Sequence, residues 1–130
     1  MKKMDDNFSE PSKQQLINLV EHFQAGRYVD SERLSLSITQ EFPKHPFAWK
    51  VLAVVLKLNG KINVSVIANQ KYINLNPKDP EAHKNLGILL YEQDKLKESE
   101  KSFKQAISLK PNYAEAYSNL GNILREQSKL

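Results

Sequence analysis

Apolar residues recur along this chain at the three- and four-residue spacing of amphipathic helices. The spacing begins at Ser12, an expected N-cap residue, and continues almost to the end of the chain. It predicts helices over about 12–25, 28–41, 46–58, 62–75, 80–92, 96–109 and 114–127. The breaks between them hold turn residues such as Gly26 and Gly60, and prolines, which cannot continue a helix interior. The pattern therefore predicts an all-α fold.

The predicted helices form pairs of constant length. Pro43, Pro77 and Pro111 are spaced by 34 residues, and parallel phrases surround them, such as "LNPKDPEAHKNLGILL" and "LKPNYAEAYSNLGNIL". A fixed period of roughly 20–50 residues indicates one supersecondary unit stacked on copies of itself. We expect three helical hairpins plus a final helix. Their units are 12–45, 46–79, 80–113 and 114–130, after a polar, flexible lead-in at 1–11.

The residues at fixed places in each unit carry a family resemblance. With the prolines at position 32, four recurrent positions hold Trp49, His83 or Tyr117 (position 4), Leu52, Leu86 or Leu120 (position 7), Ala53, Gly87 or Gly121 (position 8), and Leu56, Leu90 or Leu124 (position 11). Over about residues 12–127 this pattern resembles the tetratricopeptide repeat, or TPR. The resemblance implies a superhelical α-α solenoid whose first helices line a concave groove. We expect a packing role for His83.

The first unit follows this pattern only if one residue is missing before Gly26. Without that gap its core positions would hold polar residues. With it they become Leu16, Leu19 and Phe23, which can fill a core. The gap also moves Asn18 to position 6, which faces the groove in the family.

The resemblance places a set of candidate partner-binding residues in the groove. They are Asn18, Phe47, Lys50, Val51, Val54, Lys84, Asn85, Asn119 and Asn122. An asparagine amide offers one acceptor and two donors, so a row of them can bond both backbone groups of an extended peptide. Val51 interrupts this row at position 6. The alternative, that the amides only meet water, stays open.

Two narrower resemblances suggest different ligands. The phrase "AEAYSNLGNILRE" is similar to the TPR arms of O-linked N-acetylglucosamine transferases, in which an asparagine row holds the protein substrate. This implies an alternative role as the substrate-recognition arm of a larger glycosyltransferase-like enzyme. A second TPR class clamps acidic chaperone tails with basic residues. We do not expect that class here, because Val54 replaces a needed asparagine and Glu81 and Glu115 would repel the tail.

Two apolar surfaces suggest self-association as another alternative. Phe47, Val51, Val54 and Leu58 form a second apolar stripe on the helix over 46–58. Either it binds an apolar partner segment, or residues 1–11, with Met4 and Phe8, fold back over it; we favour a self-contact or oligomer contact. The final helix also carries an apolar stripe that could promote homo-oligomers. Its position half-way through a unit favours a fragment of a longer array over a capping helix.

Composition narrows the function further. The chain has no cysteine, which excludes disulfides and thiolate metal sites, and no apolar run of the roughly 20 residues that span a membrane. Its net charge is +4, but the basic residues are interleaved with acidic ones, so nucleic-acid binding is not expected. The scattered histidines form no metal or catalytic motif, and no cofactor-binding motif occurs. We therefore expect a cytoplasmic, non-catalytic scaffold that binds a protein or peptide partner.

Overall fold

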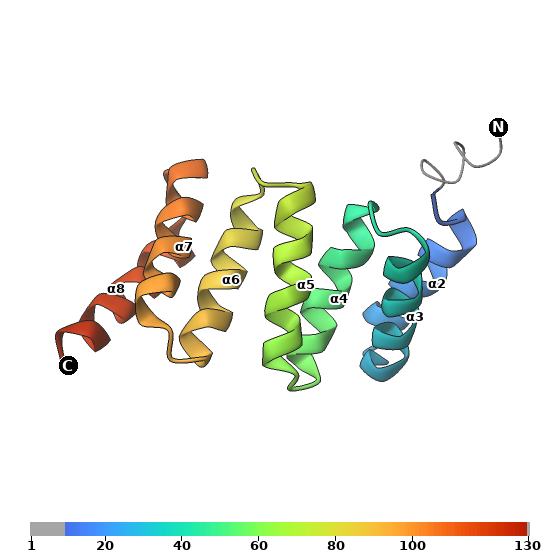
Figure 1. Ribbon diagram of the computed structural model, residues 1–130, viewed down its shortest axis with the longest axis horizontal. Helices are drawn as coiled ribbons and strands as arrows, with labels where there is room; N and C mark the ends of the chain where they lie inside the picture. Colours follow the sequence, from blue (N-terminus) through green and yellow to red (C-terminus); the bar gives the residue numbers. More distant parts are fainter. Residues whose placement is uncertain (1–9, 130) are drawn as a thin grey trace.

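The computed structural model describes residues 10–129, which contain seven helices and no strand. The helices are α2 (Lys13–Gln24), α3 (Tyr28–Glu41), α4 (Pro46–Leu58), α5 (Ile62–Leu75), α6 (Pro80–Glu92), α7 (Leu96–Leu109) and α8 (Ala114–Ser128). They follow one another along the long axis of the molecule (Figure 1). The all-α prediction is confirmed. The predicted fold-back of Met4 and Phe8 falls outside the described residues.

The helix boundaries follow from local chemistry. Ser12 caps α2 as expected: its Oγ accepts a hydrogen bond from the Gln15 amide at 3.0 Å, and the Gln15 side chain accepts one from the Ser12 amide at 2.8 Å. Asp79 caps α6 by accepting a bond from the Glu81 amide at 3.0 Å. Pro80 occupies the first turn of α6, where a proline disturbs no helical hydrogen bond. None of the helices within residues 10–129 is long and apolar enough to cross a bilayer.

The turn within each hairpin keeps the 34-residue period. Gly26, Gly60 and Asp94 occupy equivalent places and have φ angles of 77°, 79° and 62°. This left-handed conformation suits glycine, and aspartate tolerates it better than most residues. Because the turns stay in register, the one-residue gap of the first unit is absorbed within α2. The predicted shift is confirmed, since Leu19 is fully buried and Asn18 is exposed.

Hydrogen bonds between small residues hold the two helices of a hairpin together. The Ser65 hydroxyl of α5 donates to the Ala53 carbonyl of α4 at 2.6 Å, and Ser99 of α7 donates to Gly87 of α6 at 2.6 Å. All four residues are buried. A buried hydroxyl needs such a partner, so these bonds fix how each second helix sits on its first. The helices approach closely because position 8 carries almost no side chain.

A second repeated bond explains the histidine at position 4. The Trp49 indole Nε1 donates to the Pro43 carbonyl at 2.7 Å, and the Nε2 of His83 lies 2.8 Å from the equivalent Pro77 carbonyl. A carbonyl only accepts, so this nitrogen of His83 carries the proton. His83 therefore replaces tryptophan while it keeps the hydrogen bond between the connecting loop and the next helix, a structural role that differs from the packing role expected for it.

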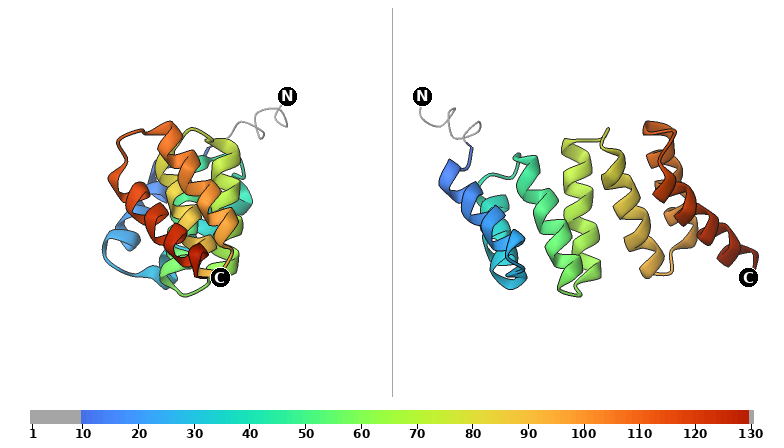
Figure 2. Two further views of the ribbon diagram at one scale, coloured as in Figure 1. Left: turned by 90° about the vertical axis from the view of Figure 1, so that its left-hand side faces the viewer. Right: turned by 180° about the vertical axis from the view of Figure 1, so that it is seen from behind.

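The core runs along the array in three adjoining clusters. The first surrounds Leu19 and Leu52, the second Tyr72 and Leu86, and the third Phe103 and Ile123. Trp49 packs against both the first and the second cluster. In Figure 1, α3 lies in front of α2 and α7 in front of α8, and the reverse view in Figure 2 exchanges them. First and second helices of the hairpins thus form two opposite sides of the solenoid.

Candidate binding groove

Two hollows lie between successive first helices. The α4–α6 hollow is lined by Val54, Lys57, Asn69, Asn85 and Leu89, with further residues around them. The α6–α8 hollow is lined at the equivalent places, 34 residues later, by Ile88, Tyr91, Phe103, Asn119 and Ile123. Because the same five positions of the repeat form both, the hollows recur along one side of the array.

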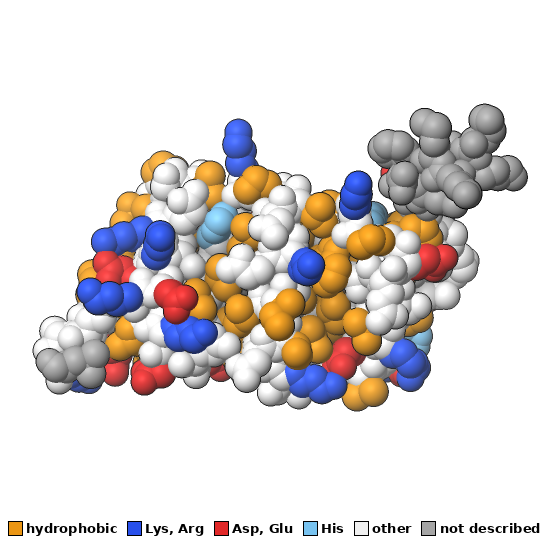
Figure 3. Space-filling view, viewed as in Figure 1, with side chains coloured by type: hydrophobic (Ala, Val, Ile, Leu, Met, Phe, Trp, Pro, Cys, Tyr) orange, Lys and Arg blue, Asp and Glu red, His pale blue; other side chains and the backbone are white. Residues whose placement is uncertain are grey.

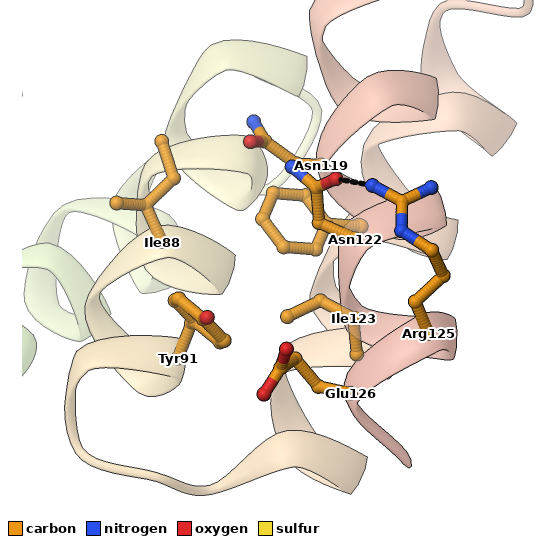
Figure 4. A pocket seen from close by; sticks show the side chains of 8 residues that line it. Ile88, Tyr91, Asn119, Asn122, Ile123, Arg125 and Glu126 are labelled. Carbon is orange, nitrogen blue, oxygen red and sulfur yellow. Dashed lines mark hydrogen bonds between the residues drawn. The ribbon is translucent and has the colours of Figure 1, made fainter. Parts of the chain in front are cut away.

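An asparagine stands at the same place in each hollow. Asn85 and Asn119 are both half-buried, so each amide lies at the edge of its hollow. Figure 4 shows Asn119 and Asn122 on α8, facing Ile88 and Tyr91 across the α6–α8 hollow. Among the residues drawn there, the one hydrogen bond joins Arg125 to Asn122.

The predicted asparagine at the start of the row lies apart from these two. Asn18 is exposed on α2, where its Oδ1 accepts a hydrogen bond from Gln14 Nε2 at 2.8 Å. Asn18 lines neither the α4–α6 nor the α6–α8 hollow. The structure therefore brings Asn85 and Asn119 into equivalent sites and does not bring Asn18 with them.

Val51 corrects one expectation. It holds the position of Asn85 one unit earlier, but its side chain is only 8% exposed and belongs to the core cluster of Leu19. Phe23 of α2 packs against the same cluster. Valine has no amide that would have to stay in contact with water, so at this position it packs between α2 and α4. Val51 is thus a core residue and not an accessible contact for a partner.

The predicted apolar stripe on α4 is divided by this burial. Phe47 and Leu58 are exposed and Val54 is half-buried, whereas Val51 is in the core. Val54 and Leu58 line the α4–α6 hollow together with Lys57. The accessible part of the stripe is therefore an apolar wall on α4, at the end of the groove that this helix forms.

Lys84 corrects a second expectation. The residue is only 9% exposed, and its Nζ lies 3.5 Å from Glu115 Oε2 and 5.7 Å from the centre of the Tyr113 ring. A cation over an aromatic face and beside a carboxylate is held by both. Lys84 therefore links α6 to the start of α8, and little of its charge is available to a partner.

Lys50, which holds the same position one unit earlier on α4, belongs to a similar network. Its Nζ lies 3.5 Å from Asp79 Oδ2 and 3.4 Å from Glu81 Oε1. The Tyr72 hydroxyl donates to the same oxygen of Asp79 at 2.5 Å. This network joins α4, α5 and the N-terminus of α6, and its two carboxylates balance the lysine charge.

The network shifts the pKa values of Lys50, Asp79 and Tyr72. Burial alone would lower the pKa of Lys50, but Asp79, Tyr72 and Glu81 together raise it above its usual value. Burial would raise the pKa of Asp79, but the Tyr72 hydrogen bond, the Lys50 charge and backbone amides hold it below its usual value. Burial and the bond to Asp79 raise the pKa of Tyr72. Near neutral pH the network is therefore an ion pair with a neutral phenol.

The sequence pattern did not predict the Tyr72–Asp79 pair. Tyr72 stands where the next unit has Ala106, and Asp79 precedes a helix-starting proline. Each residue is recognisable separately, as a core aromatic and as an N-cap. Their contact arises only because α5 and the loop before α6 meet in space.

An apolar patch on the opposite side of the array was also missed. Figure 3 shows hydrophobic side chains gathered between α3 and α5. The hollow there, which we call the outer patch, is lined by residues of α3, α4 and α5, among them Leu36, Trp49, Val64 and Ile67. The places of Val64 and Ile67 hold Glu98 and Lys101 in α7. The sequence did contain a signal for the outer patch, because α5 has apolar residues on more than one of its faces.

The comparisons agree with this geometry. A family model described as "TPR repeat" matches residues 89–128. This segment of the chain matches the TPR repeat. No curated protein sequence is significantly similar to this TPR chain. Its solved structural relatives include other TPR proteins.

Three of these structures are informative. One is the first TPR of Spaghetti (RPAP3), bound to the HSP90 peptide SRMEEVD. It is 20% identical to this chain, with a TM-score of 0.84, and the match covers 92% of this chain and 97% of that one. The Yersinia enterocolitica type III secretion chaperone SycD, in complex with a peptide of the translocator YopD, is 16% identical, with a TM-score of 0.83 and coverages of 88% and 93%. At these low identities, the TM-scores show that the chain shares the fold of both structures.

The third relative is an O-GlcNAc transferase mutant of Thermobaculum terrenum. It is 25% identical, with a TM-score of 0.75, over 86% of this chain. The match covers only 22% of that longer protein, so it concerns its TPR region.

Proposed function

We propose that this TPR array is a non-catalytic scaffold that holds an extended peptide segment of another protein along α4, α6 and α8. The observation that carries the proposal is the repetition of one half-buried asparagine, Asn85 and then Asn119, in two equivalent hollows. An extended chain has unpaired backbone groups at regular intervals, and each amide can both donate to and accept from them.

The walls of the hollows indicate which side chains such a peptide carries. Val54, Leu58 and Leu89 line the α4–α6 hollow, and Ile88, Tyr91 and Ile123 line the next one. Apolar walls beside a few polar groups are typical of binding sites in which burial gives affinity and hydrogen bonds give orientation. We infer a peptide with two separated apolar side chains whose backbone lies against the asparagines.

The charges at two places in the groove, around Lys50 and around Lys84, do not favour an acidic peptide. Lys50 and Lys84 are balanced by carboxylates, whereas the side chains of Glu81 and Glu115 are 54% and 71% exposed. The RPAP3 relative binds a peptide with acidic residues, SRMEEVD. In this chain such a peptide would meet exposed carboxylates and no unbalanced lysine at these two positions. The proposed ligand therefore differs from that of this structural neighbour.

The recognition arm of a glycosyltransferase-like enzyme is the second candidate. Its support is the 25% identity with the TPR region of the O-GlcNAc transferase, together with the asparagine-leucine-glycine phrases of this chain, which resemble such arms. It requires a catalytic domain outside these 130 residues. A sugar-transfer assay on the product of the complete gene, with groove-binding peptides as acceptors, separates the candidates: transfer supports the arm, and binding without transfer supports the scaffold. The absence of cysteine suits a cytoplasmic location for either.

A peptide selection followed by mapping tests the scaffold function. The chain is used to select binders from a displayed library of random peptides, and amide chemical shifts are recorded with and without the tightest one. We expect the perturbed amides to cluster on α4, α6 and α8 around Asn85 and Asn119. Perturbations confined to the outer patch, or a selection without binders, would contradict the proposal.

A further inference from the structure

The three helices that form the groove carry a row of polar side chains close to their C-terminal ends. Lys57, Tyr91 and Arg125 are spaced by 34 residues and occupy position 12 of the repeat in α4, α6 and α8. Lys57 lines the α4–α6 hollow, and Tyr91 and Arg125 line the α6–α8 hollow. Each hollow therefore has one basic side chain, and the two basic residues hold the same place in the repeat.

These two basic residues differ from the other lysines of the groove. Lys50 and Lys84 are each paired with carboxylates. In the part of the chain that the structure describes, no carboxylate forms an ion pair with Lys57 or Arg125. The positive charges that remain unbalanced in the groove therefore lie at position 12.

The side chain of Arg125 lies beside the proposed backbone-binding amides. Figure 4 shows it running along α8 to Asn122, while Glu126 points away from it. Arg125 donates one hydrogen bond to the Asn122 Oδ1. A guanidinium group has five N–H donors, so this bond uses only one of them. Glu126 has a different partner, since its Oε2 lies 3.1 Å from Lys129 Nζ.

The groove carries opposite charges at its two edges. The first helices start toward the upper side of the molecule in Figure 1 and end toward its lower side. Glu81 and Glu115 are exposed in the first turns of α6 and α8. Lys57 and Arg125 lie in the last turns of α4 and α8. The helix dipole favours this distribution, and it gives a bound peptide one acidic and one basic edge.

We propose that Lys57, Tyr91 and Arg125 select peptides with acidic side chains on the basic edge of the groove. This inference rests on the proposed function and adds a feature of the ligand to it. Carboxylates form charge-assisted hydrogen bonds with lysine, and the arginine fork matches a carboxylate with two parallel bonds. The tyrosine hydroxyl can donate a further bond.

The same charges fix the direction of the bound peptide. A peptide turned end for end, with its apolar side chains still in the hollows, would bring its carboxylates to the opposite edge. There they would meet Glu81 and Glu115, and like charges placed close together are unfavourable. One direction of the chain is therefore preferred.

The distance between the two cations limits the spacing of the acidic residues. Packed helices lie about 8–10 Å apart, so α4 and α8, with α6 between them, are at least about 16–20 Å apart. An extended chain covers about 3.3 Å per residue. A peptide that reaches both Lys57 and Arg125 therefore carries its two acidic residues at least about five positions apart.

A selection on charge-exchanged variants tests the inference. Random displayed peptides are selected in parallel on the unaltered chain, on Lys57→Glu with Arg125→Glu, and on a control with Lys71→Glu and Lys101→Glu. The control has the same net charge, but its substitutions are exposed on the second helices α5 and α7. We expect Asp and Glu to be enriched at least about threefold over the starting library by the unaltered chain and the control, and Lys and Arg by the groove variant.

The tightest binder of the unaltered chain provides a second measurement. Replacing its acidic residues by the corresponding amides should weaken its binding to the unaltered chain at least about fivefold. The same replacement should have little effect on binding to Lys57→Gln with Arg125→Gln, because the charges that it answers are gone.

The outcomes separate this inference from the scaffold function. Binders without acidic enrichment, or acidic binders that bind the groove variant equally well, would overturn the charge selection and leave the scaffold function standing. A selection that yields no binder on any of the three chains would contradict the scaffold function, and the inference with it. Circular dichroism of each variant verifies that its helices are retained.

Discussion

The ring of Phe103 lies directly over Gly87, so close that a Cβ on Gly87 would be 2.8 Å from the ring. This contact joins α6 to α7 at a position where a side chain could fit only if the ring moved. The equivalent Gly121 has open space around it. The two glycines share a place in the repeat, and they differ only in what packs against them.

The first prediction compares alanine at the two glycines. Both substitutions remove the flexibility of a helical glycine, which is worth about 1 kcal/mol. At Gly121 we expect a gain of that order in the free energy of unfolding. At Gly87 the forced displacement of Phe103 costs about 1–3 kcal/mol and should give a net loss. Urea denaturation measures both, and equal effects at the two sites would refute the proposed packing.

The second prediction concerns the pH dependence of stability through Asp79. Its pKa is held below the usual value in the folded chain, so its contribution is present above the unfolded pKa near ~4 and is lost as pH falls through the folded pKa. Asp79→Asn keeps an N-cap but removes the charge, and should cost about 2 kcal/mol at pH 7. Thermal unfolding between pH 7 and 2 should also show a shallower acid loss for the variant. An unchanged slope would argue against the network.

The third prediction tests the burial of Val51. Asparagine there would complete the row of position-6 amides, but it would bury an amide in the first core cluster. An unsatisfied buried polar group costs about 1–3 kcal/mol. We expect Val51→Asn to lose stability in that range, while Val54→Asn, at a half-buried place in the groove, should lose clearly less. Equal melting temperatures for the two variants would mean that Val51 is not a core residue.

The sequence predicted the helices and turns because both depend on local spacing. Packing logic also identified Leu19 as the core residue of α2, since the unshifted register left polar side chains inside. It failed for Val51 and Lys84, whose accessibility depends on neighbouring helices. Val51 is buried with residues of α2, and Lys84 is held by Glu115 and Tyr113 of the next unit. A register shows which way a side chain points, but not what covers it.

The central claim is that Asn85 and Asn119 hold the backbone of a bound peptide. The most direct measurement is the affinity of a selected groove peptide, by calorimetry, for the chain with Asn85→Ala and Asn119→Ala combined. Exposed Asn74→Ala on α5 is the matched control. Each lost hydrogen bond is worth about 1 kcal/mol, so we predict at least about tenfold weaker binding by the double variant, with unchanged helicity and melting temperature. Affinity equal to that of the Asn74→Ala control would contradict the claim.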